Sequence, residues 1–147
     1  MMRGGLAVLL VALLPGVSFA QDVDGAALFE QNCAACHNSG GTGVPGLAPP
    51  LDRPEFWQEL GDDAPTYLGG IMTKGMLTSI TVRGEMYAGI PMPPVAGVED
   101  ADLATIAGWV LADLGKTDLA VTPESITTIR ESDLTKTDLA EMRPKTQ

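Results

Sequence analysis

Two cysteines and the only histidine of the chain stand together in the run Cys33-Ala34-Ala35-Cys36-His37. This C-x-x-C-H spacing is the attachment signature of c-type haem. The two thiols can add across the haem vinyl groups, and the imidazole beside them can then reach the iron. The motif therefore predicts one covalently bound haem c, held by Cys33, Cys36 and His37.

Three other chemistries use the same residue types. A thioredoxin-like redox pair needs a βαβ setting, which the sequence does not show. A structural zinc ion takes four ligands, so carboxylates would have to complete the two Cys and one His of this chain. A disulfide between cysteines three residues apart would be strained. Haem attachment is the favoured interpretation, and the N-terminal leader supports it independently.

The first twenty residues have the composition of a secretory signal. Arg3 gives a positive start, residues 6–14 are apolar, a Pro-Gly pair follows, and small residues precede position 21. We expect cleavage after Ala20; an uncleaved anchor is the alternative, although the apolar run is short for a membrane span. The sequence thus predicts a periplasmic protein with no stable membrane span after cleavage.

The chain is acidic. It carries 9 Lys and Arg against 19 Asp and Glu, a net charge of −10. Loss of the leader removes only Arg3 among the charged residues and leaves −11. Nucleic acid is therefore not an expected partner, because its binding depends on neutralising phosphates. The charge suits attraction to a basic face of a partner protein.

The hydrophobic pattern predicts a mostly helical chain, because no alternation is long enough for a sheet. Expected helices run from an aspartate cap (Asp22 or Asp24) toward Cys33, over 55–60, from Asp63 to Lys74, and over 99–115. Glycine and proline predict irregular loops at 38–54 and 89–97, and residues 80–83 are expected to form an extended connection or short helix.

The tail after residue 115 is distinct. Thr122-Pro123-Glu124 predicts a helix start. The pentapeptide Lys-Thr-Asp-Leu-Ala occurs at 116–120 and again at 136–140, a duplication too short for a solenoid repeat. Three interpretations stay open: a tail packed back on the domain, a docking arm, and a loosely ordered polar extension.

A single histidine leaves the second axial position of the iron to another side chain or to none. In electron-transfer haem proteins a methionine often fills it and raises the reduction potential. Met92 stands in an Ile-Pro-Met-Pro-Pro run, whose prolines stiffen the loop around one candidate side chain. We expect Met92 as this ligand, with Met86 as the runner-up. The alternative is an apolar contact of Met92 at the haem edge.

With these motifs the chain resembles a class I c-type cytochrome over about residues 24–115. The family has a glycine and an aromatic residue eight and four positions before the first haem cysteine, here Gly25 and Phe29. An aromatic residue of its last helix, here Trp109, crosses them. The resemblance implies a mostly α class I cytochrome c fold, a small helical domain wrapped around one haem. The domains expected are a signal peptide (1–20), a cytochrome c domain (21–115) and a C-terminal extension (116–147).

The resemblance also assigns residues near the iron. The family has a proline twelve residues after the ligand histidine and a leucine two further on, here Pro49 and Leu51. It implies that the Pro49 carbonyl accepts the Nδ1 proton of His37, a bond that strengthens the ligand. The neighbouring Pro50 is the alternative acceptor. The family's Met-Pro pair matches the pair that begins at Met92, so His37/Met92 ligation is implied.

Two groups of residues are expected around the rest of the haem. Trp57, Tyr67 and Arg83 are candidates for bonding the propionates, because buried carboxylates need donors. The alternative is core packing for the two aromatic residues and a solvated Arg83. An exposed apolar patch around the haem edge is expected to contain Ile71, Met76, Ile90, Pro91 and Ala96.

The function expected is that of a periplasmic one-electron carrier, not an enzyme, with redox proteins as donor and acceptor. One alternative is an electron-accepting haem c subunit of a periplasmic dehydrogenase or other oxidoreductase complex, supported by the extension. Another is a haem-based small-ligand binder or sensor, which requires an open sixth site. No distal histidine is present, which disfavours a peroxidase.

Overall fold

The computed structural model of the chain describes residues 24–145. The expected signal peptide and the candidate cap Asp22 lie outside the described residues. The elements in chain order are α1 (Gly25–Asn32), α2 (Ala34–His37), η1 (Ser39–Gly41), α3 (Pro54–Leu60), η2 (Gly61–Asp63), α4 (Ala64–Lys74), β1 (Ile80–Val82), β2 (Glu85–Tyr87), α5 (Asp100–Trp109), η3 (Val110–Leu114), α6 (Pro123–Glu131) and α7 (Lys136–Met142). The expected mostly α fold is confirmed.

Local sequence explains where the predicted helices begin and end. The Asp24 side chain accepts a hydrogen bond from the Ala26 N–H at 3.0 Å and caps α1. Thr122 and Ser125 form a reciprocal capping box at the start of α6. Gly75 ends α4 with φ +78°, a conformation that suits glycine. Asp63 precedes α4 as expected, but its side chain makes no capping hydrogen bond.

The structure corrects the expectation that the chain has no sheet. β1 and β2 pair as an antiparallel hairpin in which Ile80 faces Tyr87. The two turn residues, Arg83 and Gly84, have φ +50° and +81°. Positive φ at both positions is the type I′ geometry that matches the twist of paired strands. Strands of three residues are too short to produce a recognisable alternation.

The helix expected over 99–115 changes from α-helical to π-helical geometry in its last turn. α5 is followed without interruption by η3, a π-helical turn in which the Gly115 N–H donates to the Val110 carbonyl at 2.8 Å. At this point the backbone passes Trp57 closely, since a Cβ on Gly115 would lie 3.0 Å from the Trp57 Cβ. The wider turn therefore coincides with the contact between this helix and α3.

α1 and α5 cross as the glycine and aromatic positions predict. A Cβ added to Gly25 would lie 2.6 Å from the Trp109 Cβ and 2.8 Å from the Thr105 carbonyl oxygen, so only glycine permits this approach. The rings of Phe29 and Trp109 pack with centroids 5.0 Å apart. This crossing sets the orientation of α1, which ends where the cysteine motif begins.

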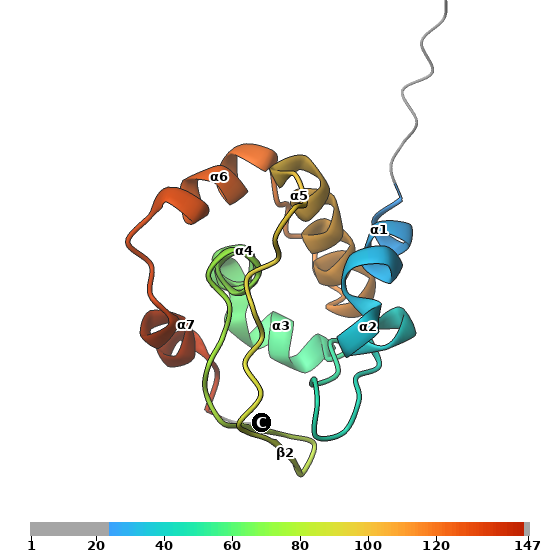
Figure 1. Cartoon of the computed structure of the whole chain (residues 1–147). Helices are drawn as coiled ribbons and strands as arrows, with labels where there is room; N and C mark the ends of the chain where they lie inside the picture. Colours follow the sequence, from blue (N-terminus) through green and yellow to red (C-terminus); the bar gives the residue numbers. More distant parts are fainter. Residues whose placement is uncertain (1–23, 146–147) are drawn as a thin grey trace, which may run out of the picture.

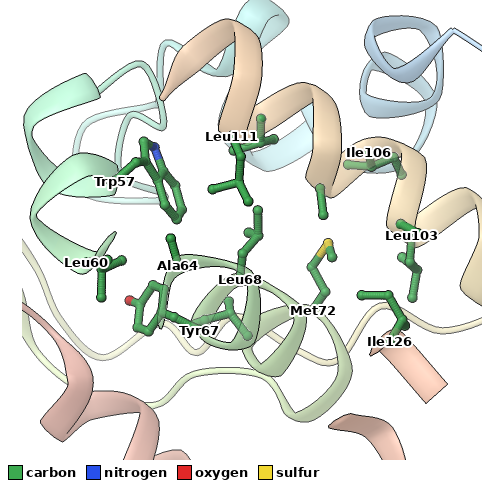
Figure 2. Close-up of a cluster of buried hydrophobic side chains, with 14 of the residues drawn as sticks. Trp57, Leu60, Ala64, Tyr67, Leu68, Met72, Leu103, Ile106, Leu111 and Ile126 are labelled. Carbon is green, nitrogen blue, oxygen red and sulfur yellow. The ribbon is translucent and has the colours of Figure 1, made fainter. Parts of the chain in front are cut away.

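α4 lies in the middle of the molecule, with α5 on one side and the two tail helices on another (Figure 1). Leu68 and Met72 of α4 face Leu103 and Leu111 of the α5–η3 segment, and Ile126 of α6 closes the end of this cluster (Figure 2). Core packing therefore accounts for Met72. No helix within residues 24–145 has the length and apolar character needed to cross a membrane.

The tail packs back on the domain. A Cβ on Gly70 would lie 2.5 Å from Leu139 Cδ2, and one on Gly69 would lie 2.8 Å from Ile129 Cδ1. Leu139 of α7 is 0% exposed, as is Ile126 of α6. A loosely ordered extension is therefore the wrong interpretation for α6 and α7. α7 itself was not expected from the sequence.

Candidate functional site

The cysteine motif occupies the corner between α1 and α2. Cys33 caps the end of α1, while Cys36 and His37 lie on the single turn of α2, whose His37 N–H donates to the Cys33 carbonyl at 2.9 Å. Both thiols are free; Cys33 is half-buried and Cys36 is exposed. Burial raises the pKa of the Cys33 thiol to about 11, helped by the neighbouring Cys36. The two sulfur atoms therefore lie on one short turn and form no disulfide with each other.

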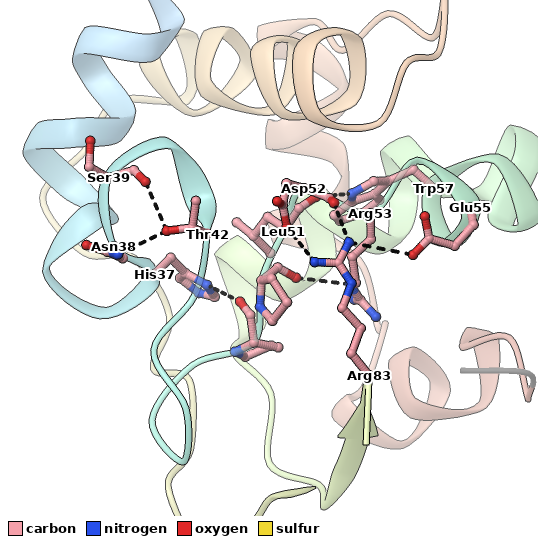
Figure 3. Close-up of polar contacts among 12 residues, drawn as sticks. His37, Asn38, Ser39, Thr42, Leu51, Asp52, Arg53, Glu55, Trp57 and Arg83 are labelled. Atoms are coloured by element: carbon pink, nitrogen blue, oxygen red, sulfur yellow. Dashed lines mark hydrogen bonds and ion pairs between the residues drawn. The ribbon is translucent and has the colours of Figure 1, made fainter. Parts of the chain in front are cut away.

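His37 is 8% exposed and makes the contact that the resemblance implies. Its Nδ1 lies 3.0 Å from the Pro49 carbonyl oxygen (Figure 3). Because a carbonyl only accepts, Nδ1 carries the proton and Nε2 keeps a lone pair for a metal. Burial lowers the pKa of the imidazole and outweighs the opposing effect of the Pro49 bond, so the neutral form is favoured. The Pro50 alternative is not the contact found, because Nδ1 bonds Pro49, while the Pro50 carbonyl accepts from Arg53 Nε at 3.0 Å.

The loop from 38 to 54 is tied to the motif by backbone bonds. The Gly43 N–H donates to the His37 carbonyl at 2.8 Å, and the Leu51 N–H donates to the Gly41 carbonyl at 2.7 Å. A Cβ on Gly43 would lie 2.5 Å from the Pro50 nitrogen, so glycine is required at this crossing of the loop. The Leu51 carbonyl in turn accepts from Trp57 Nε1 at 2.7 Å. These bonds hold the Pro49 carbonyl in position for His37.

Met92 is held by its backbone as well as by prolines. Met76 and Met92 exchange two N–H···O=C bonds of 2.9 and 3.0 Å, which ties the loop to the end of α4. A Cβ on Gly75 would lie 2.6 Å from the Met92 carbonyl oxygen, so the two segments touch. The Met92 side chain is half-buried against the core, whereas Met86 on β2 is 65% exposed.

The three propionate candidates all bond protein groups in this structure. Trp57 Nε1 donates to Leu51, and the Tyr67 hydroxyl accepts a short hydrogen bond from Arg143. Arg83 forms an ion pair with Asp52 at 3.2 Å, and its side chain is 52% exposed. Core packing for the aromatic rings and an exposed Arg83 are therefore what the structure contains.

The expected apolar patch is wrong in part. Ile71 and Met76 are buried and belong to the core. Ile90 is 54% exposed, and Pro91 and Ala96 are exposed as expected. Sequence reasoning missed three further exposed apolar side chains, Leu47, Leu77 and Met86.

Arg53 and Arg143 were also missed. The Arg53 guanidinium is almost completely buried, with its Cζ 4.1 Å from the centre of the Phe56 ring. Desolvation lowers the pKa of Arg53 to about 10, and the charge of Arg143 acts in the same direction. Neither residue belongs to a motif, and they are far apart in sequence, so no local signal could have paired them.

The donor set fits a haem c. Two free thiols precede a buried imidazole whose Nδ1 is already bonded, which is the arrangement that covalent attachment and axial ligation require. Among residues 24–145 no group of three or more His, Cys, Asp or Glu side chains gathers as a zinc site would need.

Comparison with known proteins agrees with this chemistry. The family model described as Cytochrome c matches residues 23–112. The chain belongs to the cytochrome c family. A cytochrome c-552 of Thermus thermophilus is 32% identical to this cytochrome over 103 residues, 70% of the chain and 68% of that protein. Cytochrome c-552 of Nitrosomonas europaea is 39% identical over 82 residues, 56% of the chain and 70% of that protein.

Family membership gives this cytochrome its cofactor and its general role. Members carry one covalently bound haem c with its iron, and they transfer electrons to and from redox partner proteins. The mostly helical domain is consistent with the class I cytochrome c fold.

Proposed function

We propose that this cytochrome is a periplasmic one-electron carrier of class I, with His37 and Met92 as the axial ligands of its haem. The observation that carries the proposal is the buried His37 ring, bonded to Pro49 directly after two free thiols. Cys33 and Cys36 would attach the haem, and Leu51 would pack beside it on the His37 side.

Backbone contacts support Met92 over Met86 as the second ligand. Met92 is anchored at both its N–H and its carbonyl by Met76, and its side chain packs against the core. Met86 lies on a short hairpin and points to solvent. A side chain that is anchored and half-buried loses less freedom when it binds a metal, which suits a weak iron–sulfur bond.

The haem, when bound, supplies an iron that takes up one electron and releases it again. The protein's contribution is to keep the same two side chains in place in both oxidation states. His37 cannot rotate without breaking its bond to Pro49, and the backbone that carries Met92 cannot move without separating two paired segments. Small rearrangement between the two states makes electron exchange fast, which is what a carrier requires.

Two further features support the remaining parts of the proposal. The first twenty residues have the composition of an export signal, which would bring the chain to the periplasm. The presence of the tail suggested a permanent subunit of an oxidoreductase complex. Its apolar residues Ile126, Ile129 and Leu139, however, are buried against its own domain. Its packing thus gives the subunit alternative no separate docking arm.

The absorption spectrum of the ferric, haem-loaded protein tests the ligation. We expect a weak far-red band from sulfur-to-iron charge transfer in the wild type, lost in Met92→Ala and retained in the matched control Met86→Ala. A wild type without this band, or one that binds carbon monoxide readily when reduced, would overturn the proposal in favour of a ligand binder. Loss of the band in Met86→Ala alone would move the ligand to Met86.

A further inference from the structure

Directly after α7 the C-terminal tail reaches a cluster of aromatic and cationic side chains from α3 and α4. Arg143 directly follows α7, and its guanidinium donates to the Tyr67 hydroxyl of α4. Its Cζ lies 5.0 Å from the centre of the Phe56 ring and 5.9 Å from that of Tyr67. Cations placed this way are attracted to the electron-rich ring faces. The tail is therefore held directly after α7 by a charged contact as well as by the apolar packing of α6 and α7.

The same Phe56 ring also binds Arg53, from the loop that supports the candidate iron ligand. The Arg53 Cζ lies 4.1 Å from the ring centre, and its Nε donates to the Pro50 carbonyl at 3.0 Å. The preceding carbonyl, that of Pro49, accepts from His37. Two consecutive carbonyl groups thus connect the arginine cluster and the histidine (Figure 3). The tail is linked to the haem ligand by Arg143, Phe56, Arg53 and this dipeptide.

This cluster concentrates positive charge in a chain that is otherwise acidic. Arg53 is 4% exposed, and the charges of Arg143 and Arg83 both disfavour its protonated form. Asp52 and Glu55 lie 3.2 and 3.9 Å from Arg83, which partly neutralises them, and Glu55 also favours the charged form of Arg53. Arg53 is held away from water, so its charge is screened weakly, and the half-buried Arg143 adds a second positive charge beside it.

We propose that Arg143 is a positioning residue through which the C-terminal tail raises the reduction potential of the haem. It brings a second cation to Phe56 and Arg53, beside the segment that holds His37. One-electron reduction of the ferric iron, with oxidation of the donor protein, lowers the positive charge of the site by one. A fixed cation nearby therefore favours the ferrous form. The inference rests on the proposed haem electron carrier and adds a role for the tail.

Redox titration of the haem-loaded protein tests this role. Arg143→Gln and Arg143→Met both remove the charge, and they differ in packing, so either one suffices if the other fails to fold. We expect each to lower the ferrous-to-ferric ratio at a fixed solution potential at least threefold, about 30 mV for one electron. Arg143→Lys, which keeps the charge, should remain close to the wild type.

Arg130→Met is the matched control. It removes one positive charge from α6, where Arg130 is paired with Asp100 at 2.6 Å on the surface. We expect its potential to match that of the wild type. Equal potentials in Arg143→Met, Arg143→Gln and Arg130→Met would overturn the inference, as would an Arg143→Lys potential as low as that of Arg143→Met. The far-red band, recorded for each variant, separates these outcomes from a failure of the proposed ligation.

Discussion

α4 packs against two parts of the chain that are built in different ways. On one side the tail helices press Leu139 and Ile129 onto Gly70 and Gly69, and these side chains are buried. On the other side the segment from 76 to 98, here called the strap, carries the candidate ligand Met92 and is rich in exposed residues. The tail is held mainly by apolar packing, whereas the strap combines backbone hydrogen bonds to α4 with a few buried side chains, Met76, Val82 and Tyr87.

The difference shows how a ligand can be fixed without being enclosed. The strap is joined to α4 through the Met76–Met92 pair and through the Val95 N–H, which donates to the Met72 carbonyl at 2.8 Å. These bonds leave Ile90 and Leu77 exposed. An electron carrier needs such an arrangement, because a partner must approach the cofactor closely. The tail side has no such requirement and can be packed for stability.

Truncating one aliphatic side chain in the tail and one in the strap should give the largest difference in the free energy of unfolding. Leu139→Ala deletes a completely buried side chain and should lower the free energy of unfolding by about 2–5 kcal/mol. Ile90→Ala, its matched control on the strap, should change it by no more than about 0.5 kcal/mol. Urea unfolding of the haem-loaded protein measures both. Equal losses would show that the strap is as much a part of the core as the tail.

A smaller change in stability is expected from adding a methyl group at Gly70, where α4 meets α7. Gly70→Ala places a Cβ 2.5 Å from Leu139, and overpacking outweighs the gain in helix propensity, so we expect a net loss of about 1–2 kcal/mol. Gly108→Ala in α5 meets nothing within 4 Å and should gain up to about 1 kcal/mol. Thermal melting should show a lower melting temperature for Gly70→Ala and a higher one for Gly108→Ala than for the wild type. A stabilised Gly70→Ala would mean that the tail can move away at little cost.

The smallest expected effect is a change in how the melting temperature depends on pH in acid. Asp100, at the start of α5, accepts from Thr127 and pairs with Arg130 of α6, and these contacts lower the pKa of its carboxyl. Its contribution to stability is thus present above the ordinary pKa of 3.8 and is lost as the pH falls through the lower folded value. We expect the melting temperature to decline less between pH 5 and about 3 in Asp100→Asn than in the wild type. Parallel curves would remove this pair from the forces that hold the tail.

Short-range signals predicted much of this molecule. The haem motif, the Asp24 cap and the start of α6 depend on neighbouring residues, whereas the crossing at Gly25 followed from the family resemblance. The Pro49 contact followed from the family resemblance. The contact between Arg53 and Arg143 across Phe56 could not be predicted, because it depends on how the whole tail folds back.

The repeated pentapeptide shows why α7 was missed. The copy at 136–140 begins a helix, because Thr135 before it forms a capping box with Asp138. The copy at 116–120 is irregular, and Gly115, which has no hydroxyl, occupies the position equivalent to Thr135. Five identical residues therefore adopt two conformations. The residue before them and the pocket at Gly70 that receives Leu139 account for the difference.

The reciprocal pairing of Met76 and Met92 has a consequence for how the molecule opens. The two bonds close a loop that runs from 77 to 91, and the Arg83–Asp52 pair and the buried side chains of Val82 and Tyr87 hold the same loop. Opening of the loop breaks these contacts as one unit while α4 and the tail helices keep theirs. Segments with few buried contacts open at lower free energy than the core does. In hydrogen exchange the amides of Met76 and Met92 should therefore lose protection together, ahead of the amides of α4. Such an opening would let the proposed ligand Met92 leave the iron without global unfolding.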